Sequence, residues 1–189
     1  LLAGVALFVN LPEGTKEILA TISATASILL FIRAFSSKGN PHSSWNLLFL
    51  GQLFSILFLG IFSHFDWQYI LMYLTGVTLA FLLGHLCFYQ LEKQKEQEGL
   101  SYFHGHMYEH SKLGNFFFLI CLAFMAFPIT PSFLGQEILL GHLHIEHILQ
   151  IFLFVFSYVL SEVAILRIYA KIFFGPHEKT YHEIAYKSS

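Results

Sequence analysis

The chain has 189 residues, of which 56% are hydrophobic, 17% are aromatic and only 12% are charged. Soluble domains carry roughly 25% charged residues, so this composition excludes an ordinary soluble domain and predicts a protein of the lipid bilayer. The formal net charge of −2 also provides no basic surface of the kind that binds nucleic acid.

The first apolar run, Leu1–Leu11, is shorter than the roughly 20 residues that a membrane-spanning helix needs. No basic segment precedes it, so it does not have the pattern of a signal peptide. We expect it to be the end of a helix that begins further upstream, which would make the chain a C-terminal portion of a longer protein. A short segment lying in the membrane interface is the alternative.

Five membrane-spanning helices are expected after this run, because five apolar stretches are long enough to cross a bilayer. They cover residues 18–35, 45–62, 67–91, 113–140 and 145–174, and a long polar loop occupies residues 92–112. The predicted fold is therefore all-α, a polytopic transmembrane helix bundle forming one domain over residues 1–189. Trp45 and Trp67 begin two of the spans, a position typical of aromatic side chains at the membrane interface.

The basic residues separate the two sides of the predicted bundle. If successive spans alternate in direction, nine of the ten Lys and Arg residues fall on one side and Lys16 alone falls on the other. The nine are Arg33, Lys38, Lys93, Lys95, Lys112, Arg167, Lys171, Lys179 and Lys187. The positive-inside rule makes that side cytoplasmic. We therefore expect a multi-pass protein of the bacterial inner membrane, or an equivalent energy-transducing membrane, with a cytoplasmic C-terminus.

The fourth span is predicted to be a discontinuous helix. Ser111–Leu143 would be about 50 Å long as one straight helix, against a hydrocarbon core of about 30 Å. Pro128 and Pro131 each remove a backbone N–H, and Thr130 and Ser132 can bond the backbone groups left without partners. These residues predict a break near residues 127–132, with a simple proline kink as the alternative.

Several polar side chains lie inside predicted spans, where a charge costs at least about 2.5–3.5 kcal/mol and usually marks an ion or proton path. Glu137 follows the predicted break, and Glu162 lies near the centre of the last span. Arg167 and Lys171 share a face of that helix, because they are four residues apart. His85 lies in the third span. The structural alternatives are a Glu–Arg clamp between helices for Glu162, snorkelling of the two cations to the headgroups and a hydrogen-bonded helix contact for His85.

Histidines gather in two clusters, at residues 104–110 and 142–147. Both lie at or beyond span ends, where solvated histidine is ordinary, and neither has an obvious fixed ligand geometry. Cys87 and Cys121 each lie in an apolar run and indicate no disulfide framework. We expect no metal and no cofactor, and no catalytic activity of the chain by itself.

Two segments of the chain resemble a known family. Residues 122–139, LAFMAFPITPSFLGQEIL, and residues 162–176, EVAILRIYAKIFFGP, resemble successive helices of antiporter-like membrane subunits. This family contains the large proton-pumping subunits of respiratory complex I and the Mrp-type cation/proton antiporter subunits. The resemblance implies translocation of protons or sodium ions, in association with other membrane subunits of a hetero-oligomeric complex.

The match departs from the family pattern at Gln136, where the family usually has a titratable Lys or Glu. The resemblance implies that Glu137 takes over this role and that Glu162, Arg167 and Lys171 continue a relay toward the cytoplasm, with His85 as a further candidate. Because Gln136 cannot titrate, a non-conducting scaffold that anchors a partner stays open. So does a membrane partner in an inorganic-carbon uptake complex.

Overall fold

The computed structural model describes residues 12–37, 40–62, 67–94, 107, 111–128, 130–141, 143 and 147–175. Within these ranges the chain forms helices and turns and no strand, which confirms the all-helical prediction for this part of the chain. The first apolar run, most of the polar loop, the chain end after residue 175 and most of the two histidine clusters lie outside the described residues.

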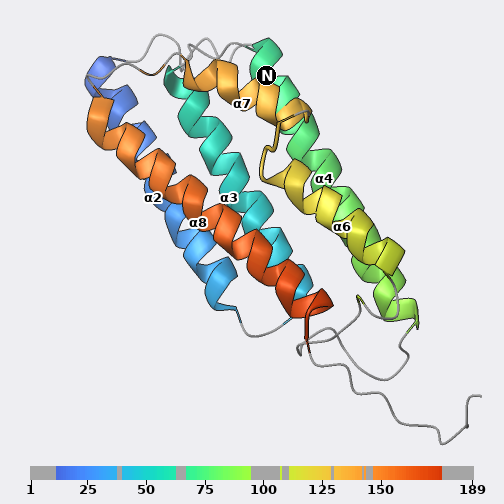
Figure 1. The fold of residues 1–189 in the computed structure, drawn as a ribbon. Helices are drawn as coiled ribbons and strands as arrows, with labels where there is room; N and C mark the ends of the chain where they lie inside the picture. Colours follow the sequence, from blue (N-terminus) through green and yellow to red (C-terminus); the bar gives the residue numbers. More distant parts are fainter. Residues whose placement is uncertain are drawn as a thin grey trace, which may run out of the picture.

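Six helices carry the fold of the described residues (Figure 1). They are α2 (Glu13–Ser36), α3 (Pro41–Phe62), α4 (Trp67–Gln94), α6 (Ser111–Phe124), α7 (Pro131–Leu140) and α8 (Ile148–Phe173). Four of them, α2, α3, α4 and α8, are long and apolar enough to cross a membrane. The predicted span 113–140 is occupied by the two shorter helices α6 and α7.

The helices form two groups that share α3. On one side α2 packs against α3 and α8, and on the other α4 packs against α6 and α7. Helices α6 and α7 follow one another along α4 (Figure 1). The ends of α2, α4 and α8 lie together with the starts of α3 and α6 (Figure 1), so the described basic residues other than Lys16 gather at that end. We call it the basic end; its described members are Arg33, Lys93, Lys112, Arg167 and Lys171.

The core is aromatic, and its centre corrects one prediction. Trp45 is fully buried rather than interfacial, and its indole Nε1 donates a hydrogen bond to the Phe81 carbonyl at 3.1 Å. The Trp45 ring stacks on Phe124, with ring centroids 4.6 Å apart. A tryptophan with a backbone acceptor inside the bundle has no need of the wet interface, and a Cβ on Gly84 would lie only 2.5 Å from this ring.

Helix α7 is held against α4 by two glycines. A Cβ on Gly135 would lie 2.5 Å from the backbone nitrogen of Tyr73, and a Cβ on Gly76 would lie 2.5 Å from the backbone nitrogen of Ser132. Both distances are far below van der Waals contact, so the two backbones approach each other where side chains are missing, as small residues permit in membrane helices. This approach fixes the position of the residues that α7 carries.

Candidate functional site

Between α6 and α7, the described residues 125–128 and 130 lie outside both helices. Ala126 adopts a positive φ of 50°, which costs a non-glycine residue roughly 1 kcal/mol or more. The chain then re-enters a helix at Pro131, at the start of α7, with Thr130 as its N-cap. Proline is favoured at this position because its missing N–H would be unpaired in any case.

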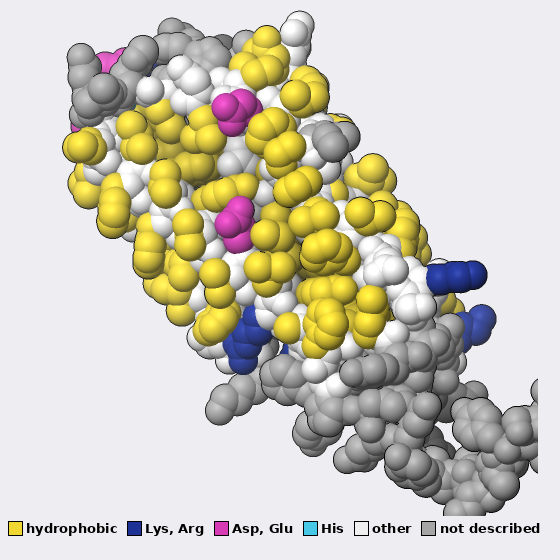
Figure 2. Space-filling view, viewed as in Figure 1, with side chains coloured by type: hydrophobic (Ala, Val, Ile, Leu, Met, Phe, Trp, Pro, Cys, Tyr) yellow, Lys and Arg dark blue, Asp and Glu magenta, His cyan; other side chains and the backbone are white. Residues whose placement is uncertain are grey.

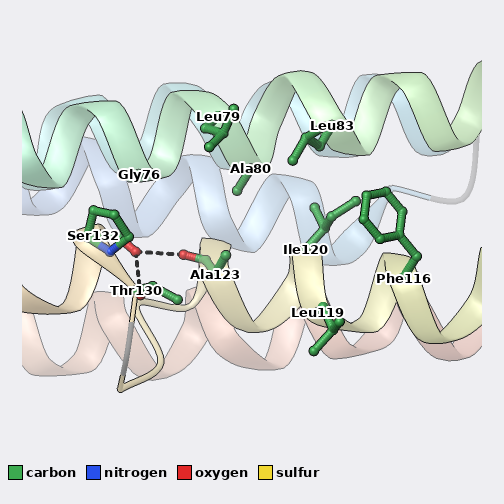
Figure 3. Close-up of a pocket in the computed structure, with 11 residues that line it drawn as sticks. Gly76, Leu79, Ala80, Leu83, Phe116, Leu119, Ile120, Ala123, Thr130 and Ser132 are labelled. Atoms are coloured by element: carbon green, nitrogen blue, oxygen red, sulfur yellow. Dashed lines mark hydrogen bonds between the residues drawn. The ribbon is translucent and has the colours of Figure 1, made fainter.

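Hydroxyl groups satisfy the carbonyls that the helix end leaves without helical partners. Ser132 Oγ donates to the Ala123 carbonyl at 2.7 Å, and Thr130 Oγ1 donates to the Phe127 carbonyl at 2.7 Å. The two hydroxyls are also 2.9 Å apart (Figure 3). Thr130 and Ser132 thus have the role that the sequence predicts for them. Pro128 and Pro131 lie within the stretch from Ala123 to Ser132 that these hydrogen bonds span.

A polar pocket of about 270 Å³ lies beside this segment, between α7 and α8. Gln136, Glu137, Tyr158 and Glu162 supply its polar side chains. Its remaining lining residues are apolar: Met125, Ala126, Phe127, Pro128, Phe133 and Leu140. The structure therefore brings together three of the predicted relay residues, from helices that the sequence does not show to be adjacent.

Gln136, and not Glu137, is the buried member of this set. Helix α7 buries Ser132, Gly135, Gln136 and Leu139, which recur at the three- and four-residue spacing of one helix face. Glu137 lies one position off that face, and its side chain is exposed. The expectation that Glu137 is buried is therefore wrong. Gln136 is only 5% exposed, and its Oε1 is buried with no hydrogen-bond partner. An unpaired buried carboxamide oxygen costs about 1–3 kcal/mol.

Tyr158 connects the parts of the pocket. Its hydroxyl donates to the Met125 carbonyl at 2.6 Å, which satisfies a backbone group of the non-helical segment. The side chains of Gln136 and Glu162 line the same pocket as Tyr158. Tyr158 and Glu162 lie on one face of α8, since they are four residues apart. Tyr158 was not among the residues predicted for the site, although its spacing of four residues before Glu162 is a signal in the sequence.

Arg167 and Lys171 lie elsewhere. They line a small separate pocket between α2, the start of α3 and α8, with Phe35, Ser37 and Ser44 among its walls. The guanidinium carbon of Arg167 lies 4.5 Å from the centroid of the Phe35 ring, a cation–π distance. The described structure therefore does not bring these two cations into the pocket of Glu137 and Glu162.

His85 is also remote from the polar pocket. It lies between α3 and α4, with its Nδ1 3.0 Å from His42 Nδ1 and its Nε2 2.9 Å from Asn46 Oδ1. His42 Nε2 in turn lies 3.0 Å from Glu92 Oε1. The hydrogen-bonded helix contact named as an alternative for His85 is therefore present. No local pattern predicts its partners, because His42 and Asn46 lie on α3, about forty residues before His85.

A second buried polar group lies deeper in the bundle. Tyr73 Oη donates to Gln52 Oε1 at 2.7 Å, and Gln52 Nε2 donates to Ser161 Oγ at 2.9 Å. All three side chains are buried. This chain of hydrogen bonds joins α4, α3 and α8, and Tyr73 is close enough to Tyr158 to interact with it electrostatically. We call these three residues the Gln52 network.

Another cavity among the described residues is apolar. It has a volume of about 170 Å³ and lies between α4, α6 and the start of α7 (Figure 3). Leucine side chains of α4 and α6 point into this region in Figure 3, where Leu79, Leu83 and Leu119 are labelled. It offers hydrophobic contact but no charged group, so it is not the candidate site.

The surface around the polar pocket suits a bilayer. Figure 2 shows a face covered mostly by hydrophobic side chains, with isolated acidic side chains among them and Lys and Arg side chains toward the basic end. Comparison of the chain with protein-family models, with curated proteins and with solved structures found no match. The geometry of the pocket and the motifs of the sequence are therefore the features that indicate a function.

Proposed function

We propose that this chain is a membrane subunit that translocates protons or sodium ions within a multi-subunit assembly similar to complex I or the Mrp-type antiporters. In this proposal α6 and α7 act together as one discontinuous span, and the pocket between α7 and α8 forms part of the ion path. The described non-helical residues between the two helices, 125–128 and 130, and the motifs that resemble the antiporter-like family support this.

The observation that carries the proposal is the shared pocket of Gln136, Glu137 and Glu162. Two carboxyl groups and one unpaired carboxamide oxygen meet beside irregular backbone, on a chain whose long helices are apolar enough to span a membrane. Each charge at that depth costs at least about 2.5–3.5 kcal/mol. Such a cost is typically retained where the groups bind or pass on an ion.

The pocket has room for water, which a relay requires. A volume of about 270 Å³ exceeds the roughly 30 Å³ that one water molecule occupies in the liquid. Water in the pocket would have the carboxylates, the Tyr158 hydroxyl and Gln136 Oε1 as bonding partners. A proton could then pass between Glu137 and Glu162 by way of Tyr158 or water, and a sodium ion would find only oxygen ligands.

The orientation of the bundle in the membrane follows from the basic end. We assign that end to the cytoplasm by the positive-inside rule, which also places the C-terminus there. Glu137 then lies on the half of the bundle away from the cytoplasm and Glu162 nearer its centre. Because Arg167 and Lys171 line a different pocket, a path from Glu162 toward them needs bridging water.

The test is the loss of the carboxylates in membrane vesicles that contain the assembled protein. Glu137→Gln and Glu162→Gln keep the side-chain volume and remove the titratable group. Each should reduce ion-coupled flux by about a hundredfold, the scale that a positioned proton-transferring group contributes. Glu17→Gln on α2, whose carboxylate pairs with His147 outside the pocket, is the matched control and should leave flux intact.

A non-conducting scaffold is the second candidate, because Gln136 cannot titrate and because the cations of α8 lie away from the carboxylates. In that case the exposed Glu137 would contact a partner subunit, such as the membrane partner of an inorganic-carbon uptake complex. Full ion flux in both glutamine variants, together with loss of the assembled complex in Glu137→Gln, would support the scaffold and refute translocation through this pocket.

A further inference from the structure

Two imidazole rings face each other between α3 and α4, near the basic end. His42, in the first turn of α3, and His85, on α4, approach with their Nδ1 atoms 3.0 Å apart. The outer nitrogen of each ring is also occupied. His42 Nε2 lies 3.0 Å from Glu92 Oε1, and His85 Nε2 lies 2.9 Å from Asn46 Oδ1. Four side chains thus form one continuous hydrogen-bonded chain.

The hydrogens of this chain can be counted. A carboxylate oxygen and a carboxamide oxygen only accept hydrogen bonds, so both Nε2 atoms must carry hydrogen. A neutral imidazole has one N–H, so two neutral rings with both Nε2 atoms protonated would leave two bare Nδ1 lone pairs facing each other at 3.0 Å. That contact is repulsive unless a cation lies between the nitrogens.

The ring geometry identifies the cation. The centroids are 5.2 Å apart and the planes are inclined by only 21°. The ring centroids are farther apart than the two Nδ1 atoms by close to two ring radii. Each Nδ1 atom therefore lies almost on the line between the centroids, and the two lone pairs point almost directly at each other. A metal ion needs about 2.0–2.1 Å to each nitrogen, which a line of 3.0 Å cannot provide. A single proton fits, because 3.0 Å is an ordinary length for a hydrogen bond between nitrogens.

We propose that His42 and His85 bind one proton between their Nδ1 atoms, as an imidazolium–imidazole pair that stores a proton at the basic end of the bundle. The proton comes from water, and the pair then carries one positive charge. Glu92, whose side chain is 42% exposed, balances that charge and connects His42 to the aqueous side. This goes beyond the proposed ion path, because the polar pocket contains neither histidine.

The surroundings of the pair provide one acidic side chain that can balance a single positive charge. Among the described residues, the groups in contact with the two rings are Glu92, Asn46 and the aromatic rings of Phe81 and Phe88. Phe88 meets both imidazoles edge-on, with centroids 5.0 Å from His42 and 6.0 Å from His85. A second proton would place hydrogen on both Nδ1 atoms and break the hydrogen bond between the two rings. The link that the pair makes between α3 and α4 therefore depends on how many protons the pair binds.

The test is ¹⁵N nuclear magnetic resonance of the histidine-labelled chain in nanodiscs at neutral pH. The pair should show three protonated nitrogens out of four, and a scalar coupling between the two Nδ1 atoms across the hydrogen bond. His85→Gln and His42→Gln identify the signals and should each abolish the coupling. His147→Gln is the control, because His147 pairs with Glu17 and not with another histidine, and it should leave the coupling intact.

Two results would overturn the proposal. Two protonated nitrogens in the pair at neutral pH would mean that both rings are neutral and that Asn46 presents its amide NH₂ to His85. Absence of the Nδ1–Nδ1 coupling in the wild-type chain would mean that no proton joins the rings. Neither result depends on ion flux, so the proton store and the ion path of the polar pocket succeed or fail separately.

Discussion

Two buried glutamines of the bundle, Gln52 and Gln136, differ in what surrounds them. Gln52 uses its carboxamide oxygen for Tyr73 and its amide for Ser161, and it is 2% exposed. Gln136 is nearly as buried, at 5% exposed, but its oxygen has no partner and it lies on the wall of a pocket with two carboxyl groups. A network in which every buried polar group has a hydrogen-bond partner makes a core rigid. A buried polar atom that has no partner within the chain must be explained by something other than the chain's own contacts. Gln52 therefore completes a buried hydrogen-bond network, whereas Gln136 contributes an unpaired oxygen beside a pocket.

The largest effect is expected from Gly135→Leu, which should remove α7 from its place and with it the pocket of Gln136. A Cβ at Gly135 already overlaps the backbone of Tyr69 and Tyr73, which cannot move like a flexible side chain. We expect a loss of unfolding free energy of about 3 kcal/mol, the upper part of the range for overpacking. Denaturation in mixed detergent micelles measures it.

The control for this prediction is Gly14→Leu on α2, where a Cβ meets no atom within 4 Å. If the two variants unfold at the same denaturant concentration, α7 is not held by its close approach to α4. The Gln52 network should survive in Gly135→Leu if α7 detaches alone, because none of its three members belongs to that helix.

The second largest effect on stability is expected from loss of the Gln52 network. Gln52→Leu leaves the Tyr73 hydroxyl without its acceptor and removes a donor to Ser161. We expect a fall in unfolding free energy of about 1–2 kcal/mol, since unsatisfied buried groups cost this much but membrane helices partly find other partners. Ion flux per folded molecule should stay at the wild-type level. A flux loss that exceeds the loss of folded protein would place Gln52 in the ion path.

The third effect concerns Arg167, which the sequence places after Glu162 in a relay and the structure places over Phe35. Arg167→Met keeps an apolar stem and removes the cation–π contact, which is worth about 0.5–1 kcal/mol at partly exposed sites. We expect a destabilisation of that size with flux retained, measured in the same vesicles as Glu162→Gln. A flux loss equal to that of Glu162→Gln would extend the relay to Arg167.

The sequence predicts the helices better than their partners, for physical reasons. Apolar length and the distribution of basic residues are local properties, so the regions of α2, α3, α4 and α8 follow from them. The hydroxyls of Thr130 and Ser132 were also predictable, because they act within ten residues of their own position. The pairing of Gln136 with Tyr158, and of His42 with His85, depends on how helices rotate and cross. Neither spacing nor composition encodes that directly.

The exposed face of α7 illustrates the same point. The sequence places a carboxylate inside an apolar run and so suggests that Glu137 is buried, yet burial depends on which face meets the neighbouring helix. Gly135 must meet α4 because its missing side chain admits the α4 backbone. That contact turns Gln136 inward and Glu137 outward, one residue away from the expectation.

The smallest stability effect is expected from Gln136→Leu, and it decides the comparison. Leucine has nearly the volume of glutamine and removes the unpaired oxygen, so the unfolding free energy should change by less than about 0.5 kcal/mol or increase. The same substitution removes a pocket oxygen beside Glu137 and Glu162, so ion-coupled flux should fall. If Gln136→Leu instead destabilises the chain as much as Gln52→Leu while flux per folded molecule is unchanged, then the two glutamines are alike. Gln136 would then have a packing role, and the pocket would have no part in transport.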